Sequence, residues 1–303
     1  MTGEINTGNN TSLRLTLKAK DYLQLMKFTL SFTVVFSCVI CYLLVPGVVY
    51  DWSRIILLFV AGMLVTGSAN TINQAAERDT DALMKRTASR PVASGRMSAN
   101  EAYGFAFITG FAGVGIMYMF FNFESALLSA ASLFLYGFIY TPLKKINSLA
   151  VLVGAFPGAL PCLIGWVAGF PSGESINWGG GLALFALQFL WQFPHFWAIA
   201  WVAHTDYSKA GFKLLPSDKG PTKFTALQTI LYALLMIPVG MLPYELSICG
   251  QVSMFIVLVC NLLLVFQCVR LYIEMDVKAA RRVMFSSYIY LPIVLLALLA
   301  DKI

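Results

Sequence analysis

Long apolar stretches alternate with short polar loops along almost the whole 303-residue chain. A helix needs about 17–25 mostly apolar residues to cross a bilayer, and nine stretches have that length. We expect membrane-spanning helices at residues 24–46, 55–77, 102–121, 125–142, 149–170, 179–203, 224–243, 247–269 and 284–300. These runs are too long and too uniformly apolar for the alternating strands of a membrane barrel. The pattern therefore predicts an all-α polytopic membrane protein.

Composition supports this interpretation, because 58% of the residues are hydrophobic and only 12% are charged, about half the charged fraction of a soluble domain. Nine spans leave little chain for a soluble part, so we expect one transmembrane domain over residues 1–303. Residues 1–23 form a polar leader without the apolar core of a signal peptide. Leucines and basic residues mix over residues 12–28, which favours either an amphipathic helix on the membrane surface or a solvated leader.

The charged residues indicate how the chain is oriented. In the nine-span arrangement, 19 of the 21 Lys and Arg residues fall on one side of the membrane, and only Arg54 and Lys302 fall on the other. The positive-inside rule places the basic side, with the N-terminus, in the cytoplasm. The net charge of +6 is therefore a topology signal, and we expect the lipid bilayer rather than nucleic acid as the partner.

A first group of polar residues lies at the cytoplasmic end of the second span. A helix turns about 100° per residue, so Asn70, Glu77 and Asp81 fall within about 80° of Asn73 on one helical face. Asp79 falls near 240°, where we expect contact with solvent or an ion pair. Two carboxylates and an amide oxygen, with no Cys or His nearby, are the ligands that Mg²⁺ accepts.

A basic run follows these acids directly and contains Lys85, Arg86 and Arg90. Arg86 and Arg90 are four residues apart, so one helical turn can direct both at the same anion, and Arg donates bidentate hydrogen bonds to phosphate oxygens. A basic loop on the cytoplasmic side is usually only a topology signal. That alternative does not explain the acids that precede it, so we expect a diphosphate carried by magnesium.

A second polar group lies at the end of the sixth span, in the run Trp191-Gln-Phe-Pro-His-Phe and the residues after it. If the helix continues, Asp206 lies about 20° from His195, Lys209 about 40° on the other side, and His204 faces away. A single His among aromatic residues is more often structural than functional. Its phase with Asp206 favours a functional His195, with Asp206 completing a second magnesium site opposite the first.

Between the two groups lies Tyr140-Thr-Pro-Leu-Lys144-Lys145. Lys144 or Lys145 can reach a diphosphate from the end of the fourth span. The alternative, that both only anchor this span at the membrane surface, is about equally supported by the sequence.

The segment NQAAERDTDALMKRTASRP resembles the first aspartate-rich motif of the UbiA superfamily of intramembrane prenyltransferases, whose usual form is close to N-D-x-x-D-x-x-x-D. Gln74 stands where the first Asp is usual, and Glu77 stands where Asp is common. The runs MKRTASRP, YTPLKK and especially WQFPHF are similar to the haem-modifying branch of that superfamily. A Lys-Pro pair is frequent in that branch where this chain has Lys27-Phe28.

The resemblance implies nine helices around a central cavity, in a bacterial inner membrane. It implies transfer of farnesyl from farnesyl diphosphate to a vinyl group of haem b, with Mg²⁺ as cofactor and haem A synthase as a downstream partner. Asn73, Glu77, Asp81, His195 and Asp206 are then the catalytic candidates. The substrate-binding candidates are Asn70, Lys85, Arg86, Arg90, Tyr140, Lys144, Lys145, Trp191 and Lys209. A different prenyl acceptor, such as a quinone precursor, and an ion-coupled transporter are the alternatives.

Overall fold

A computed structural model describes residues 17–217 and 219–303, and all structural statements below concern that part of the chain. Eight of its helices are long and apolar enough to cross a membrane. A ninth span results if the helix Leu17–Leu25 and α2 (Phe28–Leu43), which meet at a bend of 48°, are taken together. The prediction of nine spans is therefore confirmed for the described residues, with the first span bent.

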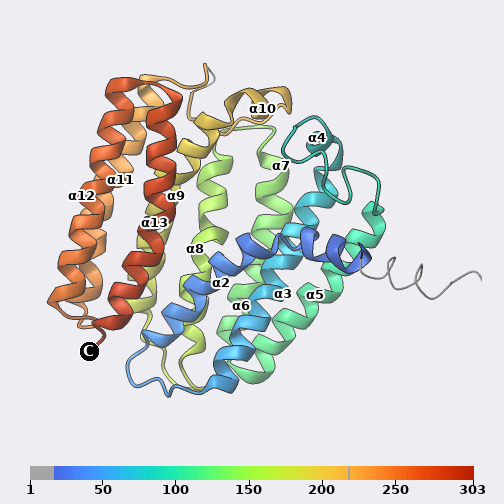
Figure 1. Cartoon of the computed structure of the whole chain (residues 1–303). Helices are drawn as coiled ribbons and strands as arrows, with labels where there is room; N and C mark the ends of the chain where they lie inside the picture. The colour runs from blue at the N-terminus through green and yellow to red at the C-terminus, as the bar shows by residue number, and fades with distance from the viewer. Residues whose placement is uncertain (1–16, 218) are drawn as a thin grey trace, which may run out of the picture.

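The remaining elements follow the order of the predicted spans closely (Figure 1). They are α3 (Trp52–Ala76), α4 (Arg78–Ala82), α5 (Ala99–Phe120), α6 (Phe123–Phe134), the π-helix η1 (Leu135–Tyr140), α7 (Thr141–Leu143), α8 (Ala150–Ala168), α9 (Trp178–Val202), α10 (His204–Lys209), α11 (Lys223–Glu245), α12 (Gln251–Glu274) and α13 (Val277–Ala300). Most of the predicted leader, residues 1–16, lies outside the described residues.

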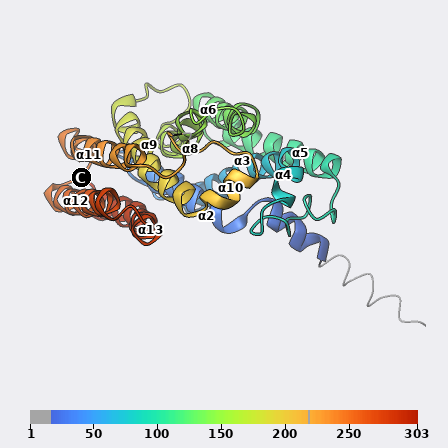
Figure 2. The same cartoon turned by 90° about the horizontal axis from the view of Figure 1, so that it is seen from above.

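Two groups of helices share α2 and α8 between them. One apolar core joins α2 and α8 to α9, α11, α12 and α13, and a second joins them to α3, α5 and α6. Seen from above, the two groups lie at opposite ends of an elongated bundle (Figure 2). The helix α8 is more enclosed than the other seven long helices, because 72% of its most apolar 18-residue stretch is buried.

Glycine lets α8 approach its neighbours closely. A Cβ atom added at Gly165 would lie 1.9 Å from the backbone oxygen of Cys38 on α2, so only a residue without a side chain fits there. One added at Gly158 would lie 1.9 Å from the side-chain oxygen of Gln192 on α9. Small residues allow such close packing of helices within a membrane, and here they fix the two groups against a common central helix.

The two ends of the bundle differ in how they are built. The short helices α4, α7 and α10 gather at one end, and the C-terminus lies at the other (Figure 1). At the C-terminal end, Lys302 Nζ donates hydrogen bonds to the backbone oxygens of Leu43 and Val45, at 2.8 and 2.7 Å. A cation on the last carbonyls of a helix is favourable, so Lys302 closes the end of α2.

Candidate active site

The first polar group lies at a junction between two helices. The helix α3 ends at Ala76 and α4 begins at Arg78, with Glu77 between them. Helix-like hydrogen bonds continue across the junction, from Glu77 N to Asn73 O at 3.0 Å and from Asp81 N to Glu77 O at 2.7 Å. The side chains of Asn73, Glu77 and Asp81 therefore keep the shared face that the sequence predicted, and none of them is more than 4% exposed.

Asp79 lies on the opposite side, as the helical phase predicted. Its side chain is 89% exposed and pairs with Arg78 at 3.3 Å. Because Asp79 and Asp81 are two residues apart on one short helix, they sample opposite environments. The contrast shows that the burial of Glu77 and Asp81 follows from their place on the helix, not from general crowding of this segment.

Each buried carboxylate has a cationic partner from another part of the chain. Glu77 Oε1 lies 2.7 Å from Lys144 Nζ, and Asp81 Oδ2 accepts a hydrogen bond of 2.6 Å from Arg90. All four side chains are largely buried, with exposures between 1% and 17%. Burying a charge without a partner is costly, so these pairs account for the presence of four charges at this depth.

Two further residues of this site were not among the sequence-based candidates. Lys27 donates a 3.2 Å hydrogen bond to Asn73 Oδ1, and Thr141 Oγ1 accepts one of 3.3 Å from Asn73 Nδ2. Lys27 has a left-handed backbone conformation at the bend before α2. Its position at the edge of the first span and the Lys-Pro pair that is frequent there in the related branch were the available signals, but neither assigned Lys27 a contact in the site.

Neighbouring amides connect α3 to the first span. Asn70 Nδ2 donates to Ser31 Oγ at 3.1 Å, and Gln74 Nε2 donates to the backbone oxygen of Leu25 at 2.8 Å. In this arrangement Asn70 holds two helices together, and its predicted contact with substrate stays a prediction. Gln74, which replaces the usual Asp of the motif, likewise anchors the bent segment.

The remaining predicted cations of the site are exposed. We call these residues, Lys85, Arg86 and Lys145, the rim of the site. Arg86 donates a 3.2 Å hydrogen bond to the Tyr207 hydroxyl and lies 5.9 Å from the centre of that ring. This contact joins the loop after α4 to α10. Free guanidinium donors at the rim are suited to oxygen-rich anions.

Tyr140 and Lys144 are positioned by the π-helix that precedes them. The segment η1 ends at Tyr140, and π-helical turns are frequent at functional sites. Lys144 Nζ lies 4.8 Å from the centre of the Tyr140 ring and 5.3 Å from that of Phe212. Cation–π contacts and the pair with Glu77 together fix the lysine, so of the two predicted lysines only Lys144 is held within the buried cluster.

The donor set fits a hard divalent cation in part. Asn73, Glu77 and Asp81 offer two carboxylates and an amide oxygen, and Asp81 Oδ1 is buried without a hydrogen-bond partner. Glu77 Oε1 is buried and forms an ion pair with Lys144 Nζ, but it accepts no hydrogen bond of good geometry. Oxygen ligands of this kind suit Mg²⁺, which also keeps water or phosphate oxygens.

Asp206 is not gathered with these acids. Among the described residues, no three His, Cys, Asp or Glu side chains are arranged to hold a metal. The helix α9 ends at Val202 and α10 begins at His204, with Ala203 between them. Helix-like hydrogen bonds continue across this junction, from Ala203 N to Ile199 O at 2.9 Å and from Tyr207 N to Ala203 O at 3.0 Å. The predicted phase of His195 with Asp206 and Lys209 therefore stays a prediction. A metal-binding role for Asp206 stays a prediction, and Lys209 is exposed on α10.

The two histidines lie in different environments, and the predicted functional preference for His195 stays a prediction. His195 is 6% exposed, whereas His204 is only partly buried. The ring of Trp191 stacks on the imidazole, with centroids 4.5 Å apart and an angle of 19°. Ser287 Oγ on α13 lies 2.8 Å from His195 Nδ1, and nothing in the apolar sequence of α13 pointed to it.

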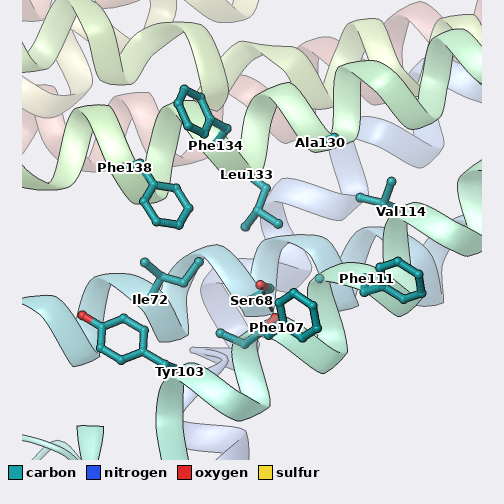
Figure 3. A pocket seen from close by; sticks show the side chains of 12 residues that line it. Ser68, Ile72, Tyr103, Phe107, Phe111, Val114, Ala130, Leu133, Phe134 and Phe138 are labelled. Atoms are coloured by element: carbon teal, nitrogen blue, oxygen red, sulfur yellow. Dashed lines mark hydrogen bonds between the residues drawn. The ribbon is translucent and has the colours of Figure 1, made fainter. Parts of the chain in front are cut away.

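An apolar cavity of about 500 Å³ lies on the other side of α3 (Figure 3). Its lining comes from α3, α5 and the α6–η1 segment, and includes Ile72, Phe107, Leu133 and Phe138. Leu133 and Phe138 extend from one wall toward Ile72 and Phe107 on the other (Figure 3). The cavity contains none of the predicted site residues, and Ile72, which directly precedes Asn73, lines this cavity and not the acidic face.

Sequence comparison gives relatives over nearly the whole chain. A protein of Cytophaga hutchinsonii named protoheme IX farnesyltransferase is 46% identical over 93% of this chain and 97% of its own length. One of Flavobacterium johnsoniae with the same name is 42% identical over 93% and 94%. The UbiA prenyltransferase family matches residues 34–290.

Solved structures share the fold. A structure described in work on digeranylgeranylglyceryl phosphate synthase has a TM-score of 0.76 at 24% identity, covering 94% of this chain and 98% of that one. A UbiA homologue from Archaeoglobus fulgidus bound to GPP and Mg²⁺ has a TM-score of 0.69 at 16% identity, covering 92% and 99%. From the family match and the sequence relatives together, this membrane-embedded chain belongs to the UbiA prenyltransferase family.

Proposed function

We propose that this prenyltransferase moves a farnesyl group from farnesyl diphosphate to a vinyl group of haem b, with addition of water, to give haem O. The similarity to two proteins named protoheme IX farnesyltransferase supports this choice of donor and acceptor. The single observation that carries the chemistry is the buried face of Asn73, Glu77 and Asp81, surrounded by cations from three other segments.

Asn73, Glu77 and Asp81 would hold Mg²⁺, with Asp206 as a further candidate ligand. A magnesium ion supplies positive charge that stabilises a diphosphate leaving group. The UbiA homologue bound to GPP and Mg²⁺ supports this pairing of ligands within the fold. Each of the three side chains presents an oxygen within a water-poor region, where electrostatic stabilisation is strong.

Lysine and arginine side chains would bind the diphosphate oxygens. Lys27, Lys144 and Arg90 already surround the acids, and Arg86 at the rim has donors directed at Tyr207. Lys85, Lys145 and Lys209 are exposed and would attract the anion from the cytoplasmic side, where the positive-inside rule places this end. Preorganised cations of this kind lower the energy of a developing anion.

The reaction separates charge at the allylic carbon. The bond between that carbon and the diphosphate oxygen breaks, and its electron pair leaves with the diphosphate. The π electrons of the vinyl group form the new carbon–carbon bond to the allylic cation. Water then adds to the cation left on the former vinyl carbon and releases a proton. Aromatic faces such as that of Tyr140 favour cationic intermediates.

The test is reconstitution of the purified protein in lipid nanodiscs with haem b, farnesyl diphosphate and Mg²⁺. We expect a haem product heavier by one farnesyl group and one hydroxyl group, and loss of that product when EDTA is added. Absence of the product, with prenylation of an added quinone precursor instead, would assign the chain a different acceptor. A product that forms equally well in EDTA would remove the magnesium from the proposal.

A further inference from the structure

Uncharged groups surround His195 in a pocket between α9 and α13. Trp191 stacks on one face of the imidazole, and the Tyr288 ring meets it edge-on at 4.9 Å. The Trp191 indole donates a 2.9 Å hydrogen bond to the backbone oxygen of Ser287. The ring is therefore fixed from two helices, which is more constraint than filling space requires.

The hydrogen bonds of this pocket determine which ring nitrogen carries the proton. Ser287 has one hydroxyl proton and donates it to the backbone oxygen of Met284 at 2.7 Å. Ser287 Oγ can then only accept at His195 Nδ1, which lies 2.8 Å away. Both contacts are satisfied when Nδ1 is protonated, so Nε2 carries a lone pair.

The helix that carries His195 leads to the proposed diphosphate site. The short helix α10 follows α9 directly, and Tyr207 on α10 accepts a 3.2 Å hydrogen bond from Arg86. Tyr288 and Phe196, whose rings contact His195, are 48% and 37% exposed, so the imidazole is covered on these sides by rings that themselves reach the surface of the protein.

We propose that His195 Nε2 ligates the iron of the haem acceptor, and that Ser287 and Trp191 are positioning residues for the imidazole. The inference rests on the proposed function for the identity of the acceptor. A neutral imidazole is a frequent axial ligand of haem iron. A hydrogen bond from its other N–H fixes the ring and increases its basicity toward metal, which is the arrangement that Ser287 provides.

The test is haem binding by the purified full-length protein, followed by absorption and electron paramagnetic resonance spectra. Wild type should give a histidine-ligated spectrum that His195→Ala lacks, and added imidazole should restore it in His195→Gly. Iron-free protoporphyrin IX should bind wild type and His195→Ala within about twofold, because it has no iron to ligate. Identical haem spectra in wild type and His195→Ala would overturn the inference.

Ser287 is tested separately, since its role is indirect. Ser287→Ala should weaken haem binding about tenfold without changing the affinity for iron-free protoporphyrin, and Ser287→Thr should retain wild-type affinity. An equal loss for both porphyrins would mean that Ser287 acts only in packing and would overturn its positioning role. Thermal unfolding of each variant shows that the comparison is made on folded protein.

Farnesyl transfer by wild type in the same nanodiscs separates the two proposals. If wild type makes the farnesylated product but shows no His195-dependent spectrum, the result contradicts iron ligation by His195 and leaves the proposed function standing. A wild type that binds haem with the His195-dependent spectrum but makes no product supports the ligation and contradicts the proposed function. His204→Ala, with its imidazole on α10 near Ser208, is the matched control and should leave the haem spectrum unchanged.

Discussion

The two polar groups of this protein are stabilised in opposite ways. At the junction of α3 and α4, buried carboxylates pair with Lys144 and Arg90. Between α9 and α13, His195 is held by a serine hydroxyl and aromatic rings. Buried ions need partners of opposite charge, whereas a neutral imidazole needs only one hydrogen bond and close packing.

This difference fits two separate roles in the proposed reaction, one in binding the charged donor and one in binding the acceptor. A charged cluster can exchange its internal partners for a metal ion and a diphosphate, because the incoming ligands also carry charge. A neutral aromatic pocket suits a flat, largely apolar acceptor. The predictions below test whether the two groups differ in energetic cost and in the catalytic step they affect.

The largest effect should come from removing one member of a buried ion pair. Lys144→Met leaves Glu77 buried and unpaired, which should destabilise the protein by about 3–5 kcal/mol. The double variant Lys144→Met/Glu77→Gln removes both charges and should recover most of that loss. Thermal unfolding in detergent measures both. Equal stability of the single and double variants would show that the pair is not coupled.

Neutralising the buried acids should have the second largest effect, measured as a loss of turnover. Glu77→Gln and Asp81→Asn keep the side-chain shape but remove the charge, and each should lower kcat/KM about 10²–10³-fold, the usual range for losing one group that stabilises transition-state charge. Asp79→Asn, an exposed residue paired with Arg78, is the matched control and should retain activity. Wild-type turnover in Asp81→Asn would remove the magnesium site.

Arg86 should have a smaller effect, because it lies at the exposed rim. Arg86→Ala should lower kcat/KM by about 10–100-fold through a higher KM for farnesyl diphosphate, since it loses donors suited to phosphate. Arg86→Lys should recover only part, as lysine lacks the bidentate geometry. A matched control is Arg270→Ala, which removes a pair with Glu274 on α12. A change in the KM for haem alone would contradict this assignment.

The neutral pocket should give the mildest loss. His195→Ala should reduce farnesyl transfer about tenfold, the lower range for losing one orienting contact at a metal, and should raise the KM for haem rather than that for farnesyl diphosphate. His204→Ala should stay close to wild type. Steady-state kinetics with each substrate varied in turn makes the distinction, and equal losses in both variants would contradict the difference between the two histidines.

The sequence predicted the spans and the acidic face because both depend on local periodicity. Nine apolar runs correspond to the helices of the described residues, and the spacing of Glu77 and Asp81 placed both on one buried face. The sequence did not predict that α9 and α10 are separate helices joined at Ala203, because neither Gly nor Pro marks that junction, and the phase of His195 with Asp206 stays a prediction.

The partners of the site residues could not be predicted for a different reason. Lys144 meets Glu77 across 67 positions of the chain, and Ser287 meets His195 across 92. Such contacts depend on how helices pack, which local patterns do not specify. Lys27 was visible in the sequence as a charge, but its contact with Asn73 depends on the bend between Leu25 and Phe28.

The depth at which each charge lies also determines how strongly dissolved salt screens it. Arg86, Lys85 and Lys145 are exposed, so dissolved salt screens them over a Debye length of about 10 Å at 0.1 M. The Asp81–Arg90 pair is shielded from solvent ions by burial. Raising ionic strength should therefore slow capture of the anionic prenyl donor while leaving the bond-breaking step almost unchanged.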